Sequence, residues 1–179
     1  MNKSLFALAT IVAAACGRAD AQDWHAQLRS ELPLLGHRNW IAVVDSAYPL
    51  QTSPGVETVY TGDEQIEVIR AVLNALNATR HVTPVIYTDS ELKHVPDDLA
   101  KGIAAYRADL QALLKGREVR SLPHEDIIAR LDEAGATFHI LVLKSTLTLP
   151  YTSVFFELDC GYWGPEKEQQ LRKIIEASK

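Results

Sequence analysis

Apolar residues along this 179-residue chain follow two kinds of pattern, compact runs and positions three or four residues apart. Runs rich in β-branched and aromatic residues are typical of buried strands, whereas the wider spacing is typical of amphipathic helices. The runs predict strands near 40–45, 56–60, 82–87, 118–122, 138–143 and 154–158. The wider spacing predicts helices near 23–35, 61–77, 96–115 and 124–135, with a last helix from Pro165 onwards.

Strands interleaved with helices predict a largely parallel sheet of about six strands. Parallel neighbours need long crossover connections, and the helices of those connections cover both faces of the sheet. The expected fold class is therefore α/β, a three-layer α/β/α sandwich.

Local signals refine this prediction. Thr61 and Glu64 have the spacing of a helix capping box. Pro84 argues against a central position for its strand, because proline cannot donate a ladder hydrogen bond. In the last helix we expect an apolar face that points inward, made by Leu171, Ile174 and Ile175.

Length and composition indicate one globular domain, which we place at residues 22–179. The chain is long enough for a substantial core and too short for two comfortable domains. Its 47% apolar and 23% charged residues are ordinary for a globular protein. A net charge of −5 argues against a nucleic-acid-binding protein, which would normally carry a basic patch. We expect no membrane-spanning helix after residue 21.

The first 21 residues have the features of an export signal. Lys3 precedes a short apolar run, and Ala19-Asp20-Ala21 has the small-x-small form of a cleavage site. The predicted location is therefore periplasmic or secreted. An alternative is a bacterial lipoprotein anchored through Cys16, although Ala13 stands where such signals usually have leucine.

The stretch from Gly36 to Pro49 contains the first candidate chemistry. His37 precedes a buried-looking strand, and Asp45 follows that strand directly. In open α/β sheets ligands bind at the carboxyl ends of strands, where an aspartate can accept hydrogen bonds from hydroxyl groups. A plainer interpretation is that His37 is a loop residue and Asp45 a turn or capping residue.

Motifs for metal or phosphate binding are missing from the sequence. His124-Glu125 lacks the second histidine of the zincin motif, and the chain has no His-x-His or Cys-x-x-Cys pair. It also lacks a phosphate-binding glycine loop and a Gly-x-Ser-x-Gly elbow. On spacing alone, we expect no metal site.

The remaining polar candidates suit an uncharged, hydroxylated ligand. Each also has a structural interpretation: a histidine can begin a helix, and a tyrosine after Pro150 can pack half-buried against the sheet. The Pro150-Tyr151-Thr152-Ser153 element is the more suggestive one, because it leads directly into a strand. The candidate residues are His37, Asp45, His124, Tyr151 and Ser153.

These motifs resemble the D-ribose pyranase and L-fucose mutarotase family. The resemblance rests on Gly36-His37 with Asp45 eight residues after the histidine, a later His-Glu before a helix, and Pro-Tyr before the final strand. It implies a three-layer α/β/α fold and a ring-shaped homo-oligomer with sites between subunits, and no cofactor. His37 would be the proton donor, and Asp45, His124, Tyr151 and Ser153 would hold a monosaccharide.

The sequence departs from this family in ways that leave its activity open. Ser153 stands where the family has asparagine, a helix follows the last strand, and an export signal precedes the domain. The first hypothesis is a mutarotase or pyranase type of isomerase that uses His37, with Tyr151 as a second proton relay. The alternatives are a non-catalytic exported protein that binds a sugar or another small ligand, and an assembly protein without a pocket.

Strand geometry adds a constraint that does not depend on the resemblance. Eight mostly extended residues separate His37 from Asp45 by up to roughly 26 Å. One sugar cannot contact both across a straight strand. Either the loop before Trp40 folds back, or an adjacent subunit completes the site.

Overall fold

The computed structural model describes residues 23–178, which form a single six-stranded sheet covered by helices. The strands are β1 (Trp40–Val44), β2 (Val56–Tyr60), β3 (Val82–Asp89), β4 (Val119–Leu122), β5 (Ile140–Lys144) and β6 (Val154–Cys160). The α-helices are α1 (Trp24–Glu31), α2 (Gln65–Asn77), α3 (Ile103–Leu113), α4 (His124–Gly135) and α5 (Pro165–Ala177), with 3-10 turns η1 (Leu32–Leu34) and η2 (Ser90–His94). The predicted signal at 1–21, including Cys16, lies outside the described residues.

The sheet is mixed but mostly parallel, with strand order β2-β5-β1-β6-β3-β4. β2, β5 and β1 run parallel to one another, as do β3 and β4, whereas β6 runs antiparallel to β1 and β3. β3 is not an edge strand, despite Pro84. Its pairing with β4 starts only at Ile86, so the stretch around Pro84 pairs with β6 alone. The missing donor of Pro84 is tolerated because one side of that stretch carries no ladder.

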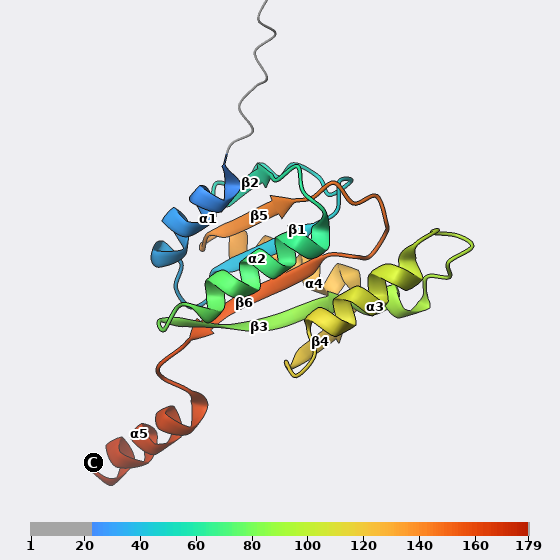
Figure 1. Cartoon of the computed structure of the whole chain (residues 1–179). Coiled ribbons are helices and arrows are strands. Elements are labelled where there is room, and N and C mark those ends of the chain that lie inside the picture. Colours follow the sequence, from blue (N-terminus) through green and yellow to red (C-terminus); the bar gives the residue numbers. More distant parts are fainter. Residues whose placement is uncertain (1–22, 179) are drawn as a thin grey trace, which may run out of the picture.

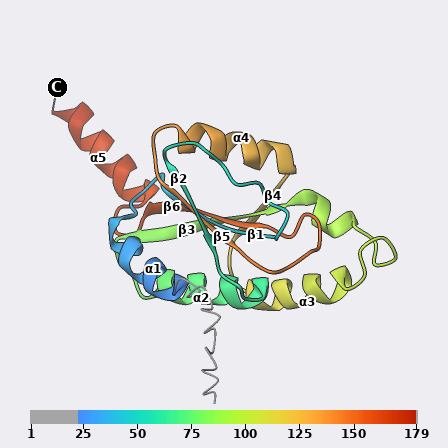
Figure 2. The same ribbon diagram turned by 90° about the horizontal axis from the view of Figure 1, so that it is seen from above.

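Three layers are visible when the sheet is viewed along its plane. α4 covers one face, and α1, α2 and α3 cover the other (Figures 1 and 2). Alternate side chains of β1 serve the two faces: Ile41 and Val43 join the core under α1, α2 and α3, and Trp40 and Ala42 join the core under α4. The predicted α/β/α sandwich is confirmed.

Two predicted helix starts are wrong. Thr61 does not cap α2, because its hydroxyl accepts from the N–H of Asp63 and the helix starts at Gln65. α3 starts at Ile103 rather than near Pro96, after Gly102 with φ of 98°. The carboxylate of Asp97 accepts from the N–H groups of Gly102 and Ala104 and so caps the later start.

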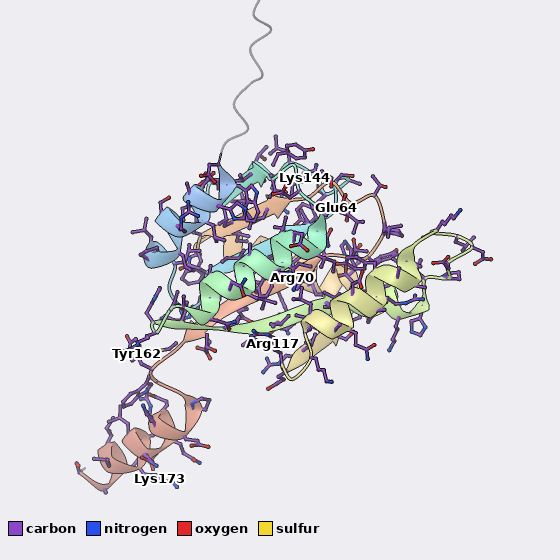
Figure 3. The ribbon with its side chains drawn as sticks, in the orientation of Figure 1. Glu64, Arg70, Arg117, Lys144, Tyr162 and Lys173 are labelled. Atoms are coloured by element: carbon purple, nitrogen blue, oxygen red, sulfur yellow. The ribbon has the colours of Figure 1, made fainter. Side chains whose placement is uncertain are left out.

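The last helix forms as predicted but does not pack as predicted. α5 extends away from the sandwich (Figure 1), with Tyr162 where it joins the body and Lys173 far along it (Figure 3). No residue of α5 is buried, and its apolar residues are exposed: Leu171 by 37%, Ile174 by 63% and Ile175 by 40%. None of the helices within residues 23–178 is long and apolar enough to span a bilayer.

Candidate functional site

The carboxyl ends of β1 and β3 meet the start of β6 at one edge of the sheet. Val154 of β6 lies opposite Val43 of β1 and opposite Thr88 of β3. One position further out, the same register places Ser153 level with Asp89. This is the kind of edge at which open α/β sheets bind ligands.

Asp45 and Ser153 both lie at this edge. Asp45 is half-buried directly after β1, and its Oδ1 accepts a 2.7 Å hydrogen bond from the N–H of Ala47. One of the two carboxylate oxygens of Asp45 therefore stabilises the turn after β1, as the plainer interpretation predicts. Ser153 is buried immediately before β6, so any hydroxyl contact that it makes comes from a rigid position.

His124 begins α4 at the same edge and is fixed through both its backbone and its ring. The carboxylate of Glu91 accepts the N–H of His124 at 3.1 Å, which places negative charge at the N-terminus of α4. The Nδ1 atom of His124 lies 3.1 Å from Oδ1 of Asp89. With Nδ1 engaged in this way, proton exchange with a ligand would use Nε2.

Tyr151 stands edge-on to His124. Their ring centroids are 5.8 Å apart with an interplanar angle of 81°, and Tyr151 is 41% exposed. The backbone of Tyr151 has φ of 56°, in the left-handed region that bulky residues avoid. Such a residue is kept at a cost of about 1–3 kcal/mol and often marks a functional site.

A buried polar network holds the Tyr151 segment in place. The carbonyl of Thr152 accepts a 2.6 Å hydrogen bond from the hydroxyl of Tyr106 and a second one from Nε2 of Gln65. Ser145 in turn donates to Oε1 of Gln65 at 3.0 Å. Burial raises the pKa of Tyr106, so its hydroxyl keeps its proton and remains a donor.

Asp89 was not singled out from the sequence, yet its carboxylate is the most perturbed charge at this edge. Its side chain is completely buried, and Oδ2 has no hydrogen-bond partner. Its pKa is raised from 3.8 to about 6, mainly by burial; His124 opposes this shift, and the charges of Glu91 and Asp45 add to it. The signal was available, since Asp89 ends a strand as Asp45 nearly does, but we expected that strand to end at Tyr87.

His37 does not join the other four predicted residues within the subunit. It is exposed in the turn before β1, next to Arg38, whose φ is 72°. The N–H of Arg38 donates to the carbonyl of Leu158, near the far end of β6 from Ser153. About six extended residues, roughly 20 Å, therefore separate His37 from the edge that holds His124.

The edge thus combines a hydrogen-bonded imidazole, a phenol, a buried hydroxyl and the carboxyl groups of Asp45, Asp89 and Glu91. Such a set can hold the hydroxyl groups of a polar ligand and exchange protons with them. Lys144, at the carboxyl end of β5, adds a cation at this end of the sheet, where its Nζ donates to the carbonyl of Tyr48 at 2.7 Å (Figure 3).

No protein-family model matches the chain, and no curated protein matches it significantly. Solved structures do match. RbsD from Bacillus subtilis, complexed with D-ribose, is 15% identical with a TM-score of 0.53, over 75% of this chain and 92% of that one. FucU from Bifidobacterium longum is 16% identical with a TM-score of 0.50, over 75% and 94%. A fucose mutarotase from Streptococcus pneumoniae in complex with L-fucose is 18% identical with a TM-score of 0.49, over 79% and 97%.

At these identities the likeness is one of fold. Nearly the whole length of RbsD and of FucU superimposes on three quarters of this chain. The chain therefore has the fold of RbsD and of FucU, as the resemblance of its motifs predicts.

Proposed function

We propose that this protein is a cofactor-independent isomerase of the mutarotase or pyranase type, which interconverts cyclic forms of a free monosaccharide. The observation that carries the proposal is the position of His124 between Asp89 and Tyr151, at the carboxyl ends of the strands. A fold shared with RbsD, a protein crystallised with D-ribose, supports a sugar as the ligand.

Ring opening of a cyclic sugar requires two proton transfers. A proton leaves the anomeric hydroxyl, and another reaches the ring oxygen. Imidazole suits this exchange because its ordinary pKa lies near neutral pH. In the proposed mechanism His37 is the general acid/base and Tyr151 is the second relay. Asp45, His124 and Ser153 hold sugar hydroxyls, with the Asp45 carboxylate making a charge-assisted bond.

The proposed role of His37 requires a second subunit. Because roughly 20 Å of extended chain separates His37 from the other four residues, a sugar of about 6 Å cannot reach both ends of β1. We therefore propose a homo-oligomer, ring-shaped by the family resemblance, in which His37 of one subunit completes the site of its neighbour. The exposed turn that carries His37 is consistent with such a contact.

Anomer exchange of aldoses, followed by saturation-transfer NMR, tests the catalytic proposal. We expect the wild type to accelerate anomer exchange of D-ribose or another aldose. In the His37→Gln and His124→Gln variants the rate of exchange should be at least about ten-fold lower. His94→Gln is the matched control, since His94 is also an exposed histidine. No acceleration by the wild type with any aldose would refute the isomerase.

Mixing variants tests whether the site is shared. His37→Gln and His124→Gln subunits, unfolded and refolded together, should regain activity, because some interfaces would pair an intact His37 with an intact His124. Failure to regain activity in verified mixed oligomers would mean that no site is shared. If a sugar raises the melting temperature of the wild type without faster exchange, the alternative function, a non-catalytic sugar-binding protein, holds instead.

We propose that the protein is exported, on the strength of residues 1–21 alone. The mass of the mature protein distinguishes cleavage after Ala21 from lipidation at Cys16. A mature chain that still begins at Met1 would contradict both routes.

A further inference from the structure

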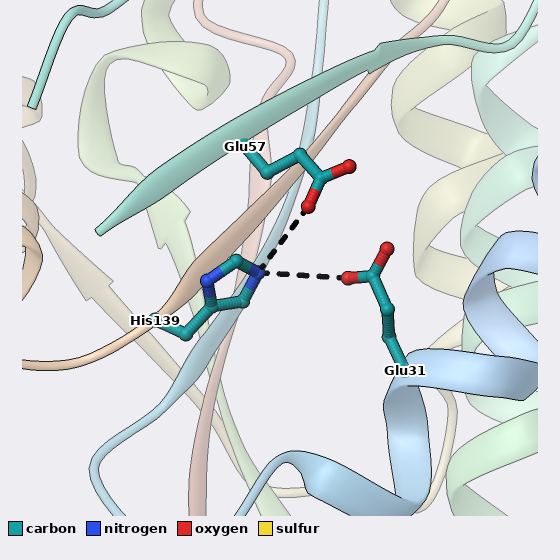
Figure 4. Close-up of side chains that lie close together, drawn as sticks. All are labelled: Glu31, Glu57 and His139. Atoms are coloured by element: carbon teal, nitrogen blue, oxygen red, sulfur yellow. Dashed lines mark ion pairs between the residues drawn. The ribbon is translucent and has the colours of Figure 1, made fainter. Parts of the chain in front are cut away.

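Two glutamates and a histidine converge at the opposite end of the sheet from the candidate sugar site. Glu31 ends α1, Glu57 lies in β2, and His139 directly precedes β5 (Figure 4). The Nε2 atom of His139 is 3.5 Å from Oε2 of Glu31 and 3.9 Å from Oε2 of Glu57. One ligand atom from each residue lies within 4.8 Å of the others.

The fold brings these residues together from three distant parts of the sequence. β2 and β5 run parallel, with Glu57 level with Leu141. Strand alternation puts Glu57 on the same face as Val59, and His139 on the same face as Leu141. Both Val59 and Leu141 pack into the core under α1 and α2, so the two side chains point towards the end of α1.

Neighbouring groups hold the three side chains in place. Nε2 of Gln27, one turn before Glu31 on α1, donates to Oε1 of Glu57 and leaves Oε2 directed at His139. The carbonyl of His139 accepts the N–H of Trp40 at 3.0 Å, which ties the histidine to β1. Such outer contacts are what fixes the ligands of metal sites.

A buried carboxylate oxygen without a hydrogen-bond partner points to a cation site. The side chain of Glu31 is only 17% exposed, and its Oε2 is buried without a hydrogen-bond partner. Leaving a buried charged oxygen unsatisfied is costly, and native structures rarely do so without a bound ion or water. This same oxygen faces His139 across 3.5 Å, a gap too long for a good hydrogen bond.

The size and charge of the gap suit a small divalent cation. A point equidistant from three atoms with these separations lies at most about 2.4 Å from each, within a few tenths of an ångström of zinc–nitrogen and zinc–oxygen bond lengths. Two carboxylates and a neutral imidazole carry a charge of −2, which a divalent ion would neutralise. Imidazole as a ligand favours a first-row transition metal over Ca²⁺ or Mg²⁺, which prefer oxygen.

We propose that Glu31, Glu57 and His139 bind a divalent transition-metal ion of the Zn²⁺ type. Three protein ligands leave a fourth position for water or another small ligand. The ion joins α1 to β2 and β5 at the amino-terminal end of β5, whereas the candidate sugar site lies at the opposite edge. The proposal therefore does not depend on the sugar isomerase.

Zinc titration of the chelator-treated protein tests the site. Isothermal calorimetry with Zn²⁺ should show one equivalent bound per chain, and Mg²⁺ and Ca²⁺ should bind far more weakly. Glu31→Gln should weaken Zn²⁺ binding at least about ten-fold, and His139→Gln should abolish it. The matched controls are His94→Gln and Glu176→Gln, at exposed positions in η2 and α5.

Cobalt provides a second readout that is independent of affinity. Co²⁺ bound by one nitrogen and two oxygens should give visible absorption bands that vanish in His139→Gln, while circular dichroism verifies that the variant is folded. Zinc binding of equal strength in the wild type, Glu31→Gln and His139→Gln would overturn the proposal. So would an absence of binding to the folded wild type.

Discussion

The stability of Asp89→Asn relative to the wild type should rise as the pH increases from 4 to 7. The folded state raises the pKa of this buried carboxyl from 3.8 to about 6, so between these values it binds a proton that the unfolded chain releases. The free energy of unfolding must therefore fall as the pH rises through this window. The stabilisation from Asp89 is complete below its unfolded pKa and is lost once the pH exceeds its folded pKa.

The size of the effect follows from the two pKa values. A difference of this size is worth about 3 kcal/mol in total, of which about 2 kcal/mol falls between pH 4 and pH 7. Asparagine does not titrate, and its carbonyl oxygen can still accept from Nδ1 of His124. We therefore expect the stability difference between Asp89→Asn and the wild type to shift by about 2 kcal/mol in favour of the variant from pH 4 to pH 7.

Urea denaturation at several pH values measures this difference directly. Titrating groups that do not interact with Asp89 contribute similarly to both proteins and cancel in the comparison. Asp98→Asn, at an exposed position, is the matched control and should follow the wild-type curve at every pH. Parallel curves for Asp89→Asn and the wild type would refute the reasoning, because they would mean that pairing with His124 outweighs burial and keeps Asp89 ionised.

Three further predictions concern the site and its support. Tyr151→Gly should abolish anomer exchange but change the free energy of unfolding little, or raise it by up to about 1 kcal/mol, because glycine adopts a φ of 56° without strain. A loss of melting temperature much larger than that of Tyr151→Ala would contradict this. Gln65→Leu should lower the free energy of unfolding, measured by urea denaturation, by about 1–3 kcal/mol, because the carbonyl of Thr152 loses a buried donor. An unchanged urea midpoint would rule out that role of Gln65. Gly55→Ala should lower the melting temperature sharply, because a Cβ there would lie 2.4 Å from the carbonyl oxygen of Phe138. A variant with wild-type stability would show that the backbone moves to accept the methyl group.

The strands were the most predictable part of this fold. β1 and β2 start where their β-branched and aromatic runs predict, and each ends at or within one residue of the predicted end. The helix starts were less predictable. A capping box at Thr61 is plausible locally, but Trp24 donates to Oδ2 of Asp63 and the turn there closes before α2 begins. Contacts between distant residues decided that boundary.

The inward face expected for α5 shows the limit of amphipathic patterns. Leu171, Ile174 and Ile175 do lie at helical spacing, and the helix forms. An amphipathic pattern predicts which face of a helix is apolar. It does not predict whether the same subunit offers a surface against which that face can pack. Here α1 to α4 lie on the two faces of the sheet, and α5 extends away from the sandwich.

The sequence by itself determined the class of fold and most of the candidate polar residues, because hydrophobic period and strand-end position are local properties of the chain. Only the tertiary structure decided which of those residues meet. It placed His124 beside Tyr151 and Asp89, put His37 at the other end of β1, and gathered His139 with two glutamates from other elements. The reason is physical: contacts between residues distant in sequence depend on strand order and register, and no spacing along the chain encodes these directly.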